Sequence, residues 1–454
     1  MHQLNSIEKR AAVALALVFS SRMLGLFMLL PVFAIYGADL KGFSPLWVGM
    51  AIGAYGLTQA ILQIPMGWLS DRIGRHKVML LGLALFAIGS VVAAVADSVY
   101  MVTLGRILQG AGAIAGAVLA LAADLTREEQ RPKVMAVIGA SIGLSFAAAM
   151  ILGPLIARWS GLSGVFWFTA VLACCSALLV MFVVPVSVNR APAAETLAAP
   201  AALGSIVKHR QLLRLDLGIM LLHLMLTALF VVLPQKLSGY QLLPDAHWLV
   251  YLPVLLCSFV LMIPMMILAM RRSQEKGYFL FAVLLLITSM LLAVSAMNLP
   301  MLIVALLLFF TGFNFLEASL PALISRIAPA GQRGSAMGVY SSSQFFGAFL
   351  GGILGGYMAQ HYGSGALFAA LAGIGLIWLL IARTMTVPAR AQRLSLAVQL
   401  QSEAEADRLA SKLTELPGVQ EVTIILAEQR CYLKVSLQQF DPEQAQQLVA
   451  TVNH

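Results

Sequence analysis

The sequence predicts an all-α polytopic membrane protein of two six-helix bundles, followed by a small α/β domain. Of its 454 residues, 60% are hydrophobic and only 11% are charged, whereas soluble globular chains carry roughly a quarter charged residues. The apolar residues occur in blocks of about 20, the length that crosses a bilayer as a helix. After Arg393 the hydrophobic period changes to two, which is typical of half-buried strands.

Twelve apolar segments follow one another through the first part of the chain. We expect transmembrane helices at about 11–36, 46–69, 78–96, 99–124, 133–157, 164–187, 211–236, 245–270, 277–297, 300–325, 333–358 and 364–386. The first segment is longer than a signal-peptide core and lacks a small-residue cleavage pattern after it, so we expect it to be retained. An even number of crossings places both termini on one side.

The basic residues identify that side. The loops on one side of the predicted membrane carry seventeen Lys and Arg residues, and the opposite loops carry only Lys41, Arg158 and Lys236. The positive-inside rule therefore predicts cytoplasmic termini in a bacterial inner membrane. This asymmetry accounts for the net charge of +9, so no nucleic-acid partner is predicted.

The two halves of the membrane part resemble each other. Gln130-Arg131 and Gly153 recur 202 positions later as Gln332-Arg333 and Gly355. A polar stretch with Pro and Gly separates the halves. We expect four parts, at 1–187 (first bundle), 188–210 (cytoplasmic linker), 211–388 (second bundle) and 389–454 (soluble domain). Duplicated six-helix units are typical of alternating-access carriers, whose site lies between the halves near the middle of the membrane.

A charged, glycine-containing motif follows the second predicted helix, at residues 67–77. Glycine allows close helix contact and tight turns, Asp71 suits the positive N-terminal end of a neighbouring helix, and Arg75 needs a carboxylate partner. The residues predicted to form a conformational latch are Gly67, Asp71, Arg72, Gly74, Arg75 and Asp124.

This motif resembles the signature loop of the major facilitator superfamily, roughly G-x-L-x-D-R-x-G-R-K-x. The run from Arg106 through Gln109 to Gly112 resembles the family's R-x-x-Q-G-x-G motif, and Leu24-Gly25 with Pro31 resembles the first helix of twelve-span drug:proton antiporters. The resemblance covers roughly residues 10–386. It implies a loop that holds the outward-facing state closed on the cytoplasmic side.

Several polar residues lie inside the predicted spans, where ionisable groups are costly and face a bundle interior or a watery cavity. The predicted substrate or proton pathway comprises Arg22, Gln59, Gln63, Arg106, His223, Asn314 and Glu317. Glu317 is the preferred titrating group, because a partly desolvated carboxyl has a raised pKa, although a structural ion pair also fits. Static packing is the alternative role for His223. Glycines at 347, 351 and 355 recur every four residues, so we expect them to form close contacts between the halves.

The tail alternates apolar and polar residues in three short runs, with one helical segment after the first run and a second after the third. Ser402 with Glu405 predicts a capping box, and Asp441-Pro442 predicts the start of a second helix. The resulting βαββα order resembles the ferredoxin-like fold of heavy-metal-associated domains. The C-x-x-C metal loop of those domains is missing near residues 400–405, so we expect no metal site. A regulatory or docking role and a passive stabilising role are both open.

These features together favour secondary active export of small organic molecules, driven by proton entry. Uptake of a metabolite or sugar, and a non-transporting sensor that signals through its tail, are the alternatives. We expect neither an enzyme nor a cofactor, and because no nucleotide-binding loop of the G-x-x-x-x-G-K-[ST] type occurs, we expect that ATP does not drive the protein directly. The expected partners are the lipid bilayer, a small-molecule substrate, protons and a cytoplasmic ligand of the tail, and a monomer is expected.

Overall fold

The computed structural model describes residues 4–127, 130–185, 200–272, 274–329, 332–386, 392–400, 402–435 and 440–452. Its helical body comprises α1 Ser6–Phe27, α2 Phe33–Tyr36, α3 Pro45–Ile73, α4 Arg75–Ala94, α5 Val99–Ala111, α6 Ala115–Asp124, α7 Arg131–Phe182, α9 Pro200–Lys208, α10 Arg210–Gly239, η2 Pro244–Ala246, α11 Trp248–Arg271, α12 Glu275–Ser295, α13 Leu299–Ile327, α14 Arg333–His361 and α15 Gly363–Arg383. The predicted linker at 188–210 contains α9, and its residues 188–199 lie outside the described part.

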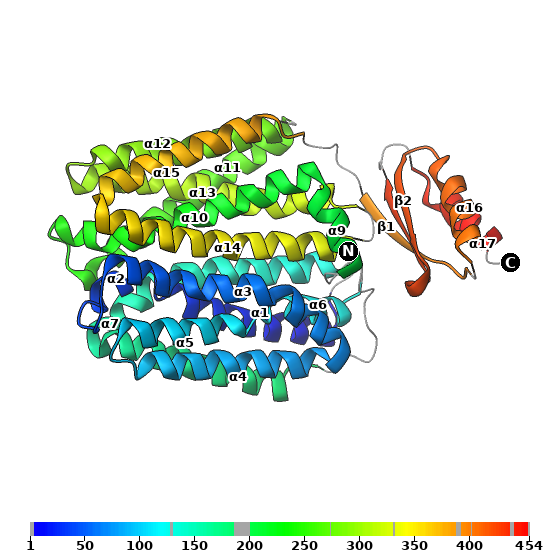
Figure 1. The fold of residues 1–454 in the computed structure, drawn as a ribbon. Coiled ribbons are helices and arrows are strands. Elements are labelled where there is room, and N and C mark those ends of the chain that lie inside the picture. Colours follow the sequence, from blue (N-terminus) through cyan, green and yellow to red (C-terminus); the bar gives the residue numbers. More distant parts are fainter. Residues whose placement is uncertain are drawn as a thin grey trace.

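Ten helices in the described part of the chain are long and apolar enough to cross a membrane. One of them, α7, has 52 residues and is interrupted at Gly161, where φ is 63° and ψ is −166°. A continuous helix of that length would span about 78 Å, far more than one bilayer core. If α7 is divided at Gly161 and the glycine-rich α14 is included (Figure 1), the described helices make the twelve predicted crossings.

Two of the predicted spans contain a break, although the span Val99–Asp124 has the predicted bounds. The segment at 11–36 leaves helical geometry after Phe27 and resumes as the short α2, with Pro31 in the intervening turns. The segment at 99–124 breaks between α5 and α6, where a Cβ on Gly112 would lie 2.3 Å from the Gly82 carbonyl oxygen. Glycine at this break therefore allows the backbones of neighbouring helices to touch.

The halves of the helical body meet along α3 and α14, which lie side by side along their length (Figure 1). The contact is made by glycine. A Cβ on Gly49 would lie 1.9 Å from the Gly352 carbonyl oxygen, and one on Gly356 would lie 2.5 Å from the Pro45 carbonyl oxygen. We predicted that Gly347, Gly351 and Gly355 form close contacts between the halves. This prediction was wrong, because the three glycines pack against α10 within the second half.

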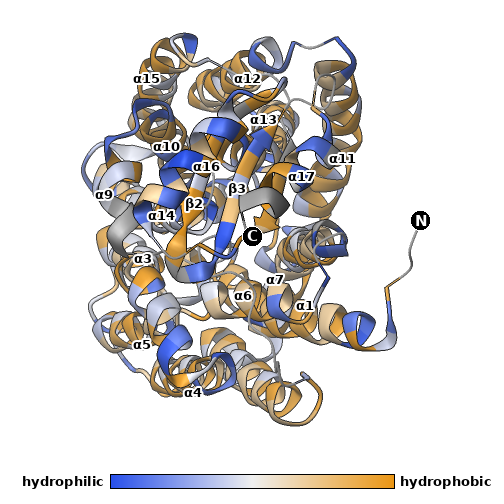
Figure 2. Ribbon diagram, turned by 90° about the vertical axis from the view of Figure 1, so that its right-hand side faces the viewer, coloured by the Kyte–Doolittle hydropathy of each residue, from blue (hydrophilic) through white to orange (hydrophobic). Residues whose placement is uncertain are grey.

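The helices of the body consist largely of apolar residues, as the mostly orange ribbons of α11 and α12 show in Figure 2. Large hydrophobic side chains point outward, including Leu144, Phe182, Val260 and Leu291. Such a surface is stable only against lipid, because water would make contiguous apolar exposure of this extent costly. The exterior of the helical body therefore agrees with the membrane class.

The tail forms a compact unit at one end of the helical body, where the N-terminus of the described chain also lies (Figure 1). We call this the domain end, and the other the opposite end. The unit contains β1 Gln392–Ala397, α16 Glu403–Thr414, β2 Val419–Ile425, η3 Leu426–Glu428, β3 Arg430–Val435 and α17 Pro442–Val452. The strands and α-helices follow the predicted order βαββα, and the antiparallel sheet has the strand order β1-β3-β2.

The core of this domain is built by the alternating residues that the sequence singled out. Leu409 and Leu413 of α16 pack with Cys431 and Leu433 of β3. The Ser402 hydroxyl accepts a hydrogen bond from the Glu405 amide at 3.3 Å, which caps α16. Among the described residues no cluster of metal-ligating side chains occurs.

Candidate gating and substrate site

Arg75 is the centre of the predicted latch at the domain end. Its side chain is only 6% exposed and its Nη1 lies 2.7 Å from Oδ1 of Asp71, one turn earlier. Its Nε lies 3.2 Å from Oδ2 of Asp124, whose side chain is 1% exposed, and its Nη1 donates to the Ser70 hydroxyl at 2.9 Å. The guanidinium thus joins the ends of α3, α4 and α6, and buried ion pairs of this kind hold their partners firmly in place.

The other latch residues shape the backbone around this ion pair. Gly74 has φ 102°, a conformation that side chains with a Cβ disfavour, and it allows α4 to start directly after α3. Gly67 lies against α6, since a Cβ on Gly116 would be 3.7 Å from the Gly67 Cα. Arg72 instead covers the Trp68 ring, with 3.7 Å between Cζ and the ring centroid.

A second set of contacts joins the two halves at the opposite end. Arg158 of α7 forms a 2.7 Å ion pair with Asp245 of η2, and Gln235 of α10 donates to the Ala34 carbonyl at 3.1 Å. These bonds, with the Gly49–Gly352 contact, close that end of the helical body. From the sequence, Arg158 was only one of the few basic residues in the loops opposite the cytoplasmic side. Neither its position nor the internal repeat predicted that it would pair with a residue of the second half.

Arg22 and Arg106 lie deep in the first half, and they are 2% and 1% exposed. Their Cζ atoms stand 5.7 Å and 4.8 Å from the centroid of the Tyr55 ring, within cation–π range. Arg106 donates to the Ala51 carbonyl and to the Gln109 amide oxygen. A hydrogen bond therefore joins the side chains of Arg106 and Gln109, the two polar residues of the motif.

Hydrogen bonds extend from Arg22 along α3. Its Nη2 donates to Gln59 Oε1, and Gln59 Nε2 donates to Gln63 Oε1 at 2.7 Å. The i, i+4 spacing of the two glutamines thus places them in one chain of hydrogen bonds, on a face turned toward the interior. Tyr55, which the sequence analysis missed, organises this region because its ring faces both guanidinium groups.

A second polar cluster lies in the other half. Gln344 Nε2 of α14 donates to Glu317 Oε1 at 3.2 Å and lies 2.9 Å from His223 Nε2. His223 Nε2 is 3.8 Å from Glu317 Oε2. Asn314, one turn from Glu317, donates instead to Ser258 at 2.8 Å. The structure therefore brings Glu317 and His223 together through Gln344, which was not among the predicted residues.

Glu317 is less buried than the arginines, because 39% of its side chain is exposed, although its Oε2 atom is buried and has no hydrogen-bond partner. The two clusters are connected through α14. Gln344 belongs to the Glu317 cluster, and its neighbour Phe345 packs edge-on against Tyr55 with 6.2 Å between ring centroids. A movement of α14 relative to α3 therefore changes the surroundings of both clusters.

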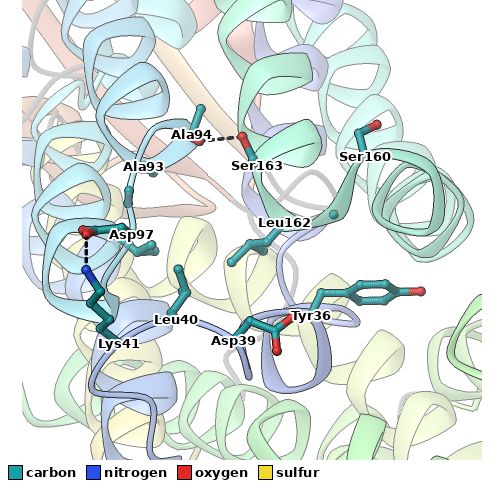
Figure 3. A pocket seen from close by; sticks show the side chains of 13 residues that line it. Tyr36, Asp39, Leu40, Lys41, Ala93, Ala94, Asp97, Ser160, Leu162 and Ser163 are labelled. Carbon is teal, nitrogen blue, oxygen red and sulfur yellow. Dashed lines mark hydrogen bonds and ion pairs between the residues drawn. The ribbon is translucent and has the colours of Figure 1, made fainter.

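A pocket of about 390 Å³ lies at the opposite end within the first half (Figure 3). Tyr36, Asp39 and the turn at Gly161 line it, and Ser163 donates to the Ala94 carbonyl at 2.5 Å. On its rim Lys41 and Asp97 form a 2.9 Å ion pair. That hydrogen bond raises the pKa of Lys41 and lowers the pKa of Asp97. The pocket is separate from both polar clusters.

Together, a duplicated helical body, a closed end and interior polar clusters define a polytopic membrane transporter. The model of the Major Facilitator Superfamily matches residues 15–268 and 215–409. The chain is 43% identical to the inner membrane transport protein YajR of Escherichia coli K12 over 442 residues, 96% of this chain and 97% of that protein. It is 27% identical to the multidrug resistance protein MdtH of Aeromonas salmonicida over 370 residues, 79% and 87% of the two chains.

Solved structures show the same fold. The nucleoside transporter NupG superposes with a TM-score of 0.66 at 14% identity, covering 84% of this chain and 99% of NupG. The human organic anion transporter MFSD10 gives a TM-score of 0.62 at 22% identity, covering 83% and 99%. The chain belongs to the Major Facilitator Superfamily and is a multi-pass inner-membrane transporter.

Proposed function

We propose that this transporter exports small organic molecules in exchange for protons, by alternating movement of its two halves. The observation that carries the proposal is the Glu317 carboxyl group, which lies within the helical body with its Oε2 buried and without a hydrogen-bond partner, and which is linked to His223 through Gln344. A carboxyl group in such a place gains and loses a proton at modest cost, whereas a permanently charged group is expensive there. The multidrug resistance relative MdtH supports export.

The movement itself is supported by the distribution of contacts. Helices α3 and α14 touch largely through glycines, which bring the two backbones into direct contact, with the Tyr55–Phe345 ring pair beside them. The Arg158–Asp245 pair and the Gln235–Ala34 bond hold the opposite end shut in this structure. We infer that the Asp71–Arg75–Asp124 latch stabilises closure of the domain end in the alternate state, with Gly67, Arg72 and Gly74 shaping its loop.

The surrounding organisation is part of the same proposal. We place the first bundle at 1–187, the linker at 188–210, the second bundle at 211–388 and the soluble domain at 389–454, with both termini cytoplasmic. The tail has the βαββα order, and its helices cover one face of the sheet. We therefore propose that it is a ferredoxin-like docking module. We also propose that the carrier is a monomer.

The test is transport by the full chain reconstituted in vesicles under an imposed pH gradient. Compounds from a panel of antimicrobial drugs are added, and internal pH is followed with a trapped dye. We expect substrate-dependent proton flux that Glu317→Gln abolishes, while Glu421→Gln, which alters a carboxylate of the tail domain, leaves it unchanged. Undiminished flux in Glu317→Gln would remove Glu317 from the mechanism.

A further inference from the structure

We propose that Arg22, which shares the Tyr55 ring with Arg106, is the binding site for the anionic group of a small aromatic or apolar carboxylate. This inference rests on the proposed transport function and deepens it by naming a substrate class. The two guanidinium groups lie at mid-depth in the first half, where packing could be achieved with apolar side chains. Two cations in an apolar helical body are costly unless an anion accompanies them.

The two arginines lack a counter-charge in the described part of the chain. Arg22 bonds only the neutral Gln59 amide, and Arg106 bonds a backbone carbonyl and the neutral Gln109 amide. The ion pairs found in the described part of the chain include neither arginine. By contrast, the buried Arg75 has two carboxylate partners. The site therefore carries two positive charges that the described side chains do not neutralise.

The Nε and Nη1 atoms of Arg22 are buried and have no hydrogen-bond partner. Nε and Nη1 lie on different edges of the guanidinium, and Nη2 completes each edge, so a carboxylate binds Arg22 through two parallel N–H groups by displacing the Gln59 oxygen from Nη2 and taking the free donor on the same edge. A buried N–H without an acceptor is unfavourable, so an acceptor bound at this edge would remove an existing penalty. The unused donors of Arg22 therefore call for an acceptor with two oxygens, such as a carboxylate.

Arg22 is surrounded by aromatic rings: its Cζ lies 5.6 Å from the Phe86 centroid and 5.7 Å from that of Tyr55. Phe345 of the second half contacts Tyr55 on the side of the half-to-half boundary. Aromatic edges and faces accept planar apolar groups. The site therefore suits a carboxylate with an attached ring.

The Gln59 amide makes this site adjustable. In this structure its oxygen occupies one donor of Arg22 while its nitrogen is held by Gln63. An incoming carboxylate would replace the neutral amide oxygen with a charged acceptor, and charge-assisted hydrogen bonds are roughly twice as strong as neutral ones. Gln59 thus serves as the occupant of the site when no anion is bound.

The experiment measures binding rather than transport, so that its outcome is independent of proton coupling. The full chain in lipid nanodiscs is equilibrated by dialysis with three probes of matched shape, 2-naphthoate, neutral 2-naphthamide and cationic 2-naphthylmethylammonium, with empty nanodiscs as the blank. We expect naphthoate to bind at least about tenfold more tightly than either matched probe, which is about 1.4 kcal/mol. Arg22→Gln abolishes that preference.

Two further variants separate a binding role from a folding role. Arg22→Lys retains a charge but loses the fork of donors, so it keeps a preference for naphthoate that is weaker than wild type. Arg214→Gln, at the domain end of α10 where its side chain donates to the Thr384 carbonyl, keeps the full preference. Equal binding of the three probes, no binding of naphthoate, or an unchanged preference in a folded Arg22→Gln protein would each overturn the proposal. None of these outcomes bears on whether the protein moves protons.

Discussion

Replacing Gly49 with Ala tests whether the glycine contact at the opposite end holds that end closed. A Cβ at this position would lie 1.9 Å from the Gly352 carbonyl oxygen, while an ordinary contact between such atoms is about 3.4 Å. Helices α3 and α14 would therefore have to separate by about 1.5 Å, which breaks close packing along the contact. We expect the substitution to oppose the closed arrangement specifically.

The expected magnitude follows from the cost of overpacking, which is about 1–3 kcal/mol for an inserted methyl group in a well-packed contact. Each 1.4 kcal/mol is a factor of about ten in an equilibrium. Gly49→Ala should thus lower the population of the closed opposite end by roughly 5- to 150-fold. Gly53→Ala, whose Cβ would meet the Phe349 carbonyl oxygen at 2.9 Å, should have a smaller effect of the same sign.

The assay is a distance measurement between spin labels on the two halves at that end. Ser160 and the exposed Leu243 are suitable positions, once the exposed cysteines Cys174, Cys175 and Cys257 have been replaced. We expect Gly49→Ala to move the distance distribution toward longer values. Gly373→Ala, where a Cβ would meet no atom within 4 Å, provides the matched control.

The reasoning would be refuted by a Gly49→Ala protein whose distance distribution coincides with that of Gly373→Ala. A general loss of thermal stability without a longer distance would also count against it, since that result would mean that the glycine supports the fold alone.

Other predictions concern the ion pairs and the tail domain. Asp124→Asn should lower stability by roughly 1–3 kcal/mol, seen as a lower melting temperature, because it leaves the buried Arg75 with a weaker partner; unaltered melting would contradict this. Arg158→Glu should favour opening of the opposite end by up to about 1 kcal/mol, since the pair is partly exposed, and adding Asp245→Arg should restore the wild-type distance distribution. Burial raises the pKa of Cys431 to about 12, so maleimide should label it only in the unfolded tail, and more readily as pH rises through 9, where the unfolded thiol ionises and the folded one does not. Rapid labelling at neutral pH would show that the tail core is open.

The membrane class and the helix order could be predicted because both depend on local composition. Blocks of apolar residues and a one-sided distribution of Lys and Arg report directly on the bilayer. The breaks after Phe27 and Ala111 could not be located in the same way, because hydropathy does not change there. They arise from backbone contacts with distant helices, as at Gly112 and Gly82.

The candidate site shows the same division. Glu317, His223, Arg22 and Arg106 stand out in sequence because charge is costly inside a span. Gln344 and Tyr55 are ordinary in composition, and only the fold places them between the charged groups. The glycines at 347, 351 and 355 were assigned to the wrong neighbour for a related reason: a four-residue repeat indicates which face packs closely, but not which helix it meets.

The central claim is that the opposite end must open and close during transport. With Arg158 and Asp245 replaced by cysteines, a short reducible bifunctional thiol reagent would join the halves where their ion pair now holds them. We predict that the joined protein transports no substrate and that reduction of the reagent restores transport. Transport at the unlinked rate with the bridge intact would contradict the account.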